Sequence, residues 1–237
     1  MRKLIKSQFR LVFHNKLFYI CLALVVLLDP IFRFSGILDS ATRHSLIFPG
    51  IAGFFEGQLD IIGIVFIVVF CCYDFNDGTT KNIIGRGYTR KQLILSKYIV
   101  SLLSLFIIYA VTCLLYFVLF IKNGFGFESD LVYPLINSII SIIAYTVIYG
   151  TVALLIEKNG YSIVVCLFAP NIINLALGIA DSKFKMNISQ FWIEGGANKF
   201  LEKPTFGNLS LSILYYVIYI VIFAFVAIKV SESREIK

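Results

Sequence analysis

The side chains that could do chemistry are concentrated in one polar stretch, residues 74–97, which reads DFNDGTTKNIIGRGYTRKQLILSK between two strongly apolar runs. Residues that cap or end helices recur along it: Asp77, Gly78, Thr79, Thr80, Gly85, Gly87 and Thr89. They predict a short helix over about residues 77–84, a turn, and a second helix that starts at Arg90. We therefore expect a rigid elbow here rather than a flexible linker.

The charges of this stretch suggest two roles. Asp74 and Arg90 carry opposite charges on either side of the short helix, and we expect them to form an ion pair that fixes the angle of the elbow. Lys81 and Arg86 would face outward and offer positive charge to a partner surface. The sequence also allows these charges to act only in setting topology and in solvation.

The signatures of an active site or a nucleotide site are absent from the sequence. No GxxxxGKS/T phosphate loop occurs, and Gly85-Arg86-Gly87 lacks both its spacing and its preceding strand. No HExxH or GxSxG motif occurs, and the five cysteines lie in apolar runs without the spacing of a metal site. We therefore expect no enzyme, metal or bound cofactor on this chain, and we interpret the cysteines as small apolar fillers.

Apolar runs make up most of the chain. Of its 237 residues, 59% are hydrophobic and 15% are charged, a balance typical of an integral membrane protein. A helix needs about 20 apolar residues to cross the hydrocarbon core of a bilayer. The sequence predicts an all-α polytopic membrane protein, a single transmembrane domain over residues 1–237 with about six spans at residues 17–34, 51–73, 98–121, 131–156, 161–180 and 209–230.

Basic residues outside these spans favour an orientation with both termini in the cytoplasm. In that orientation 14 of the 21 Lys and Arg residues lie on the inner side and 7 on the outer side. The formal net charge of +7 then faces anionic lipid or a cytoplasmic partner, so nucleic acid is not needed to explain it.

Two further segments have their own patterns. Residues 1–16 combine basic and apolar side chains at near-helical spacing, which predicts an interfacial amphipathic helix; a basic tail that only sets topology is the alternative. The outer segment, residues 181–208, contains an apolar cluster from Ile188 to Ile193 that includes Trp192. For this cluster we expect either a short helix that dips into the outer interface or an exposed loop.

Three amides lie inside predicted spans: Asn137, Asn171 and Asn174. They could line a translocation path, although amides in membranes more often hydrogen-bond neighbouring helices. Pro170 beside Asn171 predicts a kinked or broken fifth span, because proline removes a backbone donor. Ionisable residues deep in the spans, which would favour an ion-coupled carrier, are few.

The elbow resembles the corresponding connection in the membrane subunits of type-2 ATP-binding-cassette exporters. There an acidic residue, Gly-Thr, Lys-Asn, a Ser/Thr-Arg pair and a Lys recur in order; here they are Asp74, Gly78-Thr79, Lys81-Asn82, Thr89-Arg90 and Lys97. The basic amphipathic start, the six-span layout and the overall length are similar as well. The chain departs from the pattern in having Asp74 in place of Glu and in lacking a large outer domain.

The resemblance implies a permease of the bacterial peptide, lantibiotic or antibiotic export kind, located in the plasma membrane. Residues 77–84 would form a coupling helix in a groove of a separate cytoplasmic ATPase subunit, present in two copies and carrying ATP and Mg²⁺. A second permease, identical or similar, would complete the transporter, and the cargo would be an amphipathic peptide or another hydrophobic molecule. The implied coupling residues are Asp74, Asp77, Gly78, Thr79, Lys81, Asn82, Arg86 and Arg90.

Two other functions are compatible with the sequence. A membrane-embedded immunity or regulatory protein would bind a peptide or a sensor without transporting it. A secondary carrier would use an ion gradient and would be indifferent to an ATPase partner. Copurification with an ATPase subunit separates the exporter from both.

Overall fold

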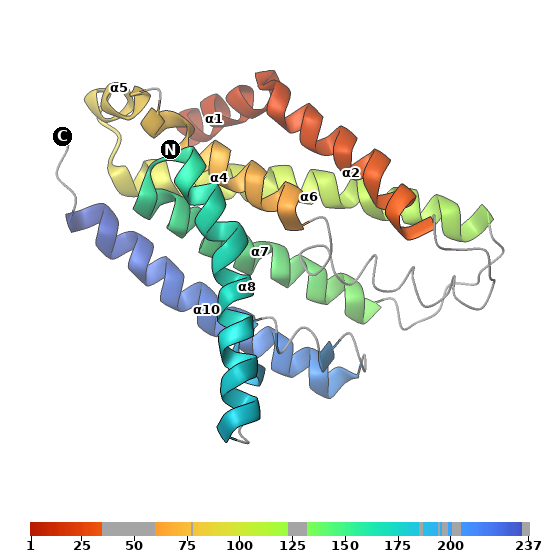
Figure 1. The fold of residues 1–237 in the computed structure, drawn as a ribbon. Coiled ribbons are helices and arrows are strands. Elements are labelled where there is room, and N and C mark those ends of the chain that lie inside the picture. The colour runs from red at the N-terminus through yellow and green to blue at the C-terminus, as the bar shows by residue number, and fades with distance from the viewer. Residues whose placement is uncertain are drawn as a thin grey trace.

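The computed structural model describes residues 1–34, 60–76, 78–122, 132–184, 187–193, 195, 199–200 and 205–233. The regular structure in these ranges is helical (Figure 1). In chain order the elements are α1 Arg2–His14, α2 Lys16–Phe34, α4 Asp60–Asn76, α5 Thr79–Gly85, α6 Arg90–Lys122, α7 Val132–Ile156, α8 Asn159–Phe184, the 3-10 helix η2 Ile188–Phe191, and α10 Phe206–Ser233.

Four of these helices, α6, α7, α8 and α10, are long and apolar enough to cross a membrane. Two further spans result if each of two bent pairs is counted as one: α1 with α2, bent by 60°, and α4 with α5, bent by 64°. Helices satisfy their own backbone hydrogen bonds, which is what the hydrocarbon region requires of a spanning segment. The chain is therefore a polytopic helical membrane protein.

The predicted spans correspond to observed helices wherever the structure describes them. The span at 17–34 matches α2, and the last four correspond to α6, α7, α8 and α10. Of the span at 51–73, residues 51–59 lie outside the described residues, and the remainder belongs to α4.

The helix that the sequence predicts to start at Arg90 and to continue into the membrane-spanning region is confirmed. The helix predicted from Arg90 and the span predicted from residue 98 are one continuous helix, α6, of 33 residues. The polar residues at its start do not interrupt it because Arg, Lys and Gln are good helix formers. At the other end of the bundle, α8 continues to Phe184 and so includes the first residues of the predicted outer segment.

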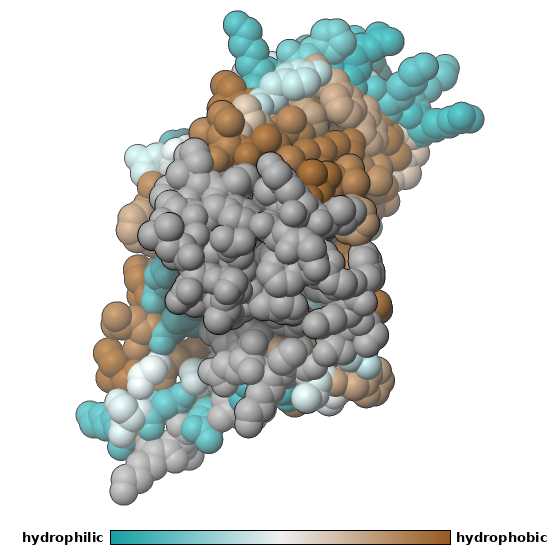
Figure 2. Space-filling model, turned by 90° about the vertical axis from the view of Figure 1, so that its right-hand side faces the viewer, coloured by the Kyte–Doolittle hydropathy of each residue, from teal (hydrophilic) through white to brown (hydrophobic). Residues whose placement is uncertain are grey.

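The two chain ends and the elbow lie at the same end of the bundle. The start of α1, the helix α5, the turn between α7 and α8, and the end of α10 gather on the left of Figure 1. On the face shown in Figure 2, hydrophilic residues cover the top and hydrophobic surface lies directly below them. Hydrophobic residues therefore reach the surface next to hydrophilic ones on this side of the molecule.

Helix α1 is amphipathic, as predicted. Leu4, Gln8 and Val12 are buried at a spacing of four residues, while its Arg and Lys side chains are exposed. It packs against α6 and α2. The break before α2 occurs at Asn15, which is extended and whose side-chain Oδ1 accepts a hydrogen bond from the N–H of Leu17. The location of α1 at a membrane interface stays a prediction.

The core is built around α4, which packs against α2, α6, α7 and α8. Ile67, Val68, Cys71 and Cys72 of α4 are each 0% exposed. All five cysteines are free thiols, and four of them are buried. Cys71 and Cys72 thus pack as small side chains where α4 is surrounded, which agrees with the prediction that they are fillers.

A close approach between α6 and α7 occurs at Gly150. The ring of Tyr98 from α6 lies over this glycine, and a Cβ at position 150 would be 2.5 Å from Cε1 of the ring. The ring cannot easily give way because its hydroxyl hydrogen-bonds Oγ1 of Thr151 at 2.9 Å. Small residues let transmembrane helices approach closely, and Gly150 serves this purpose here.

We therefore predict that Gly150→Ala destabilises the protein by about 1–3 kcal/mol, the usual cost of overpacking a fixed contact. Thermal unfolding of the purified protein in detergent measures this. Gly178→Ala is the matched control, because nothing lies within 4 Å of a Cβ at that position of α8. Because alanine has a higher helix propensity than glycine, Gly178→Ala should raise the free energy of unfolding by up to about 1 kcal/mol. Equal effects of the two substitutions would contradict the packing role of Gly150.

Candidate functional site

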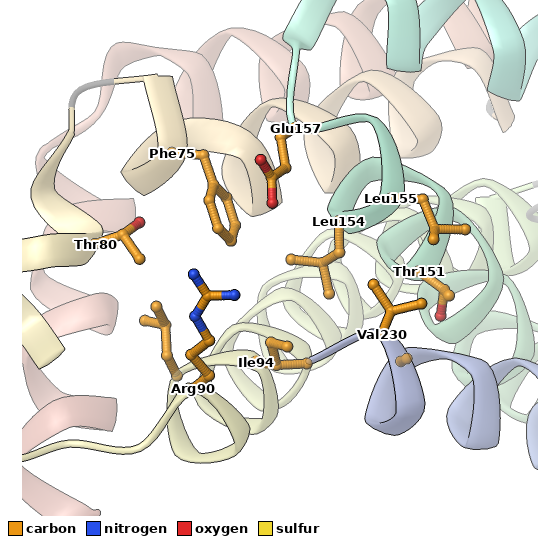
Figure 3. A pocket seen from close by; sticks show the side chains of 11 residues that line it. Phe75, Thr80, Arg90, Ile94, Thr151, Leu154, Leu155, Glu157 and Val230 are labelled. Carbon is orange, nitrogen blue, oxygen red and sulfur yellow. The ribbon is translucent and has the colours of Figure 1, made fainter. Parts of the chain in front are cut away.

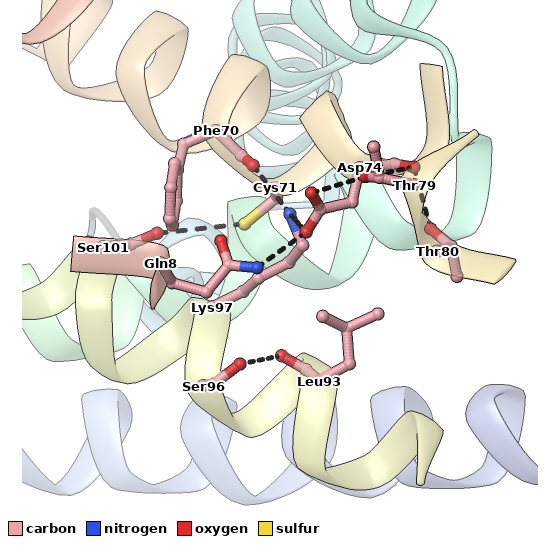
Figure 4. A network of polar contacts seen from close by, with 10 residues as sticks. All are labelled: Gln8, Phe70, Cys71, Asp74, Thr79, Thr80, Leu93, Ser96, Lys97 and Ser101. Atoms are coloured by element: carbon pink, nitrogen blue, oxygen red, sulfur yellow. Dashed lines mark hydrogen bonds and ion pairs between the residues drawn. The ribbon is translucent and has the colours of Figure 1, made fainter. Parts of the chain in front are cut away.

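The elbow between α4 and α6 is held together by a buried carboxylate, that of Asp74, near the end of α4. Its Oδ2 lies 3.0 Å from Nζ of Lys97 and accepts a hydrogen bond of 2.9 Å from Nε2 of Gln8. Its Oδ1 accepts a hydrogen bond of 2.9 Å from the hydroxyl of Thr79 (Figure 4). One side chain thereby connects α1, α4, α5 and α6.

Lys97 is the cationic half of this arrangement and is fully buried, with 0% of its side chain exposed. Besides Asp74 it donates a hydrogen bond of 2.9 Å to the backbone oxygen of Phe70, and its ammonium lies 5.1 Å from the centre of the Phe70 ring. A buried ion pair is tolerated only when further hydrogen bonds offset the loss of water from both charges. The additional partners of Lys97 and Asp74 meet this condition.

Asp74 also fixes the start of α5, through both its side chain and its backbone oxygen. The Thr79 hydroxyl donates to the Asp74 side chain, and the Thr80 hydroxyl donates to its backbone oxygen at 2.9 Å. Between the two helices, Gly78 has φ +65°, a conformation that other L-residues seldom adopt. The turn at Gly78 and the two threonine bonds therefore set how α5 leaves α4.

The far end of the elbow follows the predicted pattern. α5 ends at Gly85, and Gly87 follows in a left-handed conformation with φ +86°. The Thr89 hydroxyl accepts a hydrogen bond from the N–H of Gln92, and the Gln92 side chain accepts one from the N–H of Thr89, both at 3.2 Å. This reciprocal pair is a capping box, and it starts α6 at Arg90.

The predicted pairing of Asp74 with Arg90 is wrong, since Asp74 pairs with Lys97 instead. The physical reason is the position of the two cations along α6: Lys97 follows Arg90 by seven residues, which is about 10 Å along a helix, and it is Lys97 that lies at the level of Asp74. Arg90 lies in a small cavity of about 30 Å³ near the α7–α8 turn, lined also by Phe75 and Glu157 (Figure 3).

Gln8 is a site residue that the sequence interpretation missed. It is 3% exposed and lies on the buried face of α1 between Leu4 and Val12. A single polar residue at helical spacing in an otherwise apolar face is the signal that could have indicated an internal partner.

The predicted coupling residues separate into an inner and an outer group. Asp74 is buried, and Thr79 and Arg90 are partly buried. Lys81, Asn82 and Arg86 are exposed on α5 and just after it, together with Gly78. Asp77 lies outside the described residues. The elbow therefore has a fixed interior and a polar exposed surface, which we call the α5 surface: Lys81, Asn82 and Arg86.

The three amides proposed for a translocation path do not form one cluster. Asn137 is buried in α7, and its Oδ1 accepts a hydrogen bond of 2.8 Å from the hydroxyl of Ser212 on α10. Asn171 is exposed on α8 and donates to the backbone oxygen of Leu167 in its own helix at 2.8 Å. Asn174 lies one turn further along α8 and is partly buried. α8 passes through Pro170 as one helix.

The outer segment contains a short helix, which is one of the two alternatives that the sequence allows. η2 follows α8 and begins where the carboxylate of Asp181 accepts hydrogen bonds from the N–H groups of Ile188 and Ser189. The segment lies back against the spans: Trp192 packs edge-on against Tyr219 of α10, and Ile193 is 3% exposed. Trp192 and Ile193 therefore pack against the bundle.

Comparison of the chain with protein-family models, with curated proteins and with solved structures finds no match. Within the described ranges, no three His, Cys, Asp or Glu side chains are grouped so as to hold a metal ion. The contacts of the elbow are the structural features that bear on function.

The buried pair makes a direct prediction about stability. Lys97→Met should lower the free energy of unfolding by about 3–5 kcal/mol, because it leaves the Asp74 carboxylate buried without a counter-charge. Adding Asp74→Asn should recover part of this loss, since no buried charge then remains while an amide oxygen can still accept from Thr79.

Unfolding of Lys97→Met and of the double variant in the same detergent tests this, and Lys91→Met is the control. Lys91 is an exposed lysine of the same helix, and its loss should change stability by less than about 1 kcal/mol. A double variant no more stable than Lys97→Met would refute the ion pair as the source of the effect.

Proposed function

We propose that this chain is the membrane subunit of an ATP-driven exporter of the type-2 ATP-binding-cassette kind, and that α5 is its coupling helix. The observation that carries the proposal is the Asp74–Lys97 pair. It joins α5 to two long helices through buried contacts while the α5 surface stays exposed. A short helix held in this way transmits a rigid-body displacement, whereas a loop would absorb it.

In the proposed arrangement the end of the bundle that carries α5 and both termini faces the cytoplasm. The exposed basic residues of α1 and of the α5 surface then lie on the side where positive charge is retained and where an ATPase partner is accessible. We propose six spans, with α1 at the inner interface of a bacterial plasma membrane and η2 near the outer side.

In the proposed mechanism the ATPase subunits bind ATP and this chain transmits their movement to the membrane-spanning helices. ATP and Mg²⁺ bind to two copies of a separate ATPase, and closure of these two copies moves the α5 surface. The Asp74–Lys97 pair passes this movement to α4 and α6. A second permease, identical or similar, forms the other wall of the path, and the cargo is an amphipathic peptide or a related hydrophobic molecule. The many exposed aromatic and aliphatic side chains of the spans suit such a cargo.

The α5 surface should determine binding of the ATPase. We predict that Lys81→Glu with Arg86→Glu weakens association with the ATPase encoded in an adjacent reading frame by about tenfold or more, because charge complementarity at the interface is reversed. Copurification and ATP-dependent export measure this. Both residues are exposed, so the unfolding temperature should not change.

Lys183→Glu provides the matched control, because Lys183 is exposed at the end of α8 far from α5 (Figure 1). It should leave association and export unchanged. Full association of the double variant, or failure of any phosphate-loop ATPase to copurify with the native chain, would favour an immunity or regulatory protein instead.

Asn171 and Asn137 should respond differently to replacement by leucine. Asn171 is exposed and donates a hydrogen bond to Leu167 in its own helix, so Asn171→Leu should fold and assemble. If Asn171 contacts the cargo, this variant should export poorly. Asn137→Leu should instead reduce stability, by about 0.6–2 kcal/mol, because it removes the hydrogen bond to Ser212. Normal export by Asn171→Leu would remove it from the path.

A further inference from the structure

A second feature lies away from the elbow, where the outer segment folds back on the spans. A cavity of about 140 Å³ is enclosed by α7, α8, α10 and the residues that follow η2. Its walls are mainly aliphatic and aromatic and include Tyr149, Val152, Ala169, Pro170, Trp192 and Phe223. An apolar cavity of about 150 Å³ in a protein interior stays free of water and accepts a molecule of the size of benzene.

Trp192 contributes a buried polar atom to this part of the structure. The indole Nε1 of Trp192 is buried, and within the described part of the chain it makes no hydrogen bond. Leaving a buried donor unpaired costs about 1–3 kcal/mol.

Neither water nor lipid satisfies this donor well. A buried water needs two to four polar partners, and the cavity wall is predominantly apolar. A lipid acyl chain could fill part of the space but has no acceptor along its methylenes. Val165 of α8 lines the cavity and is 41% exposed, which offers a route of entry for a molecule dissolved in the bilayer.

We propose that this cavity is a binding site for a small neutral ring of about the size of benzene that carries one hydrogen-bond acceptor. The ring fills the apolar space between α7, α8 and α10, and the acceptor pairs with the Trp192 N–H. The proposal does not depend on the exporter function, because it concerns binding and not transport.

Trp192 is the one tryptophan of the chain, so its fluorescence reports directly on occupancy. Benzene and pyridine are the probes, since they have nearly the same shape and differ in a ring nitrogen that accepts a hydrogen bond. Both should change the fluorescence in a saturable manner and raise the unfolding temperature of the native chain in detergent. Ala169→Leu should abolish both effects by filling the cavity from α8.

Ala176→Leu is the matched control, because Ala176 is exposed on the same helix and does not line the cavity. Val152→Phe fills the cavity from α7 and replaces Ala169→Leu if the latter does not fold. Saturable binding that survives cavity filling, or no saturable binding by the native chain, would overturn the proposal.

The role of the indole N–H is tested separately with Trp192→Phe, by the shift in unfolding temperature. The ratio of pyridine affinity to benzene affinity should fall by about five- to tenfold in this variant, the effect expected for one net hydrogen bond. This ratio cancels differences in partitioning and in cavity size. An unchanged ratio would show that Trp192 contributes only its ring, and the acceptor requirement would be refuted.

Discussion

The interior of the elbow depends on one electrostatic constraint: a carboxylate and an ammonium buried side by side must satisfy each other. Asp74 and Lys97 come from the end of α4 and from within α6, and neither reaches water. Because separation would leave two charges in a medium of low dielectric constant, the relative position of the two helices is strongly restrained. Thr79 and Gln8 add neutral hydrogen bonds to the same carboxylate and so bring α5 and α1 under the same restraint.

This arrangement gives α1 a structural role inside the protein. Its basic residues are exposed, but the amide of Gln8 reaches the Asp74 carboxylate. A displacement of α1 would therefore remove a hydrogen bond from the buried pair. The N-terminal helix and the elbow are in this sense one mechanical unit, although they are far apart in the sequence.

The parts of the elbow that depend on neighbouring residues could be predicted from the sequence. Thr89 starts a helix because Gln92 is three positions away, and α5 ends at Gly85, with Gly87 following in a left-handed conformation. The pairing of Asp74 could not be predicted in this way. It depends on the unbroken course of α6 and on the packing of α1, whose Gln8 is 66 positions from its partner. Asn137 and Ser212, 75 positions apart, illustrate the same limit.

The length of α6 has a consequence for how large a movement the elbow requires. At 1.5 Å per residue its 33 residues extend for about 50 Å, whereas the hydrocarbon core is about 30 Å thick. The helix is thus longer than the hydrocarbon core is thick. If it pivots near its far end, a rotation of about 5° displaces Arg90 by about 4 Å, so small angular changes inside the bundle correspond to large excursions at the elbow.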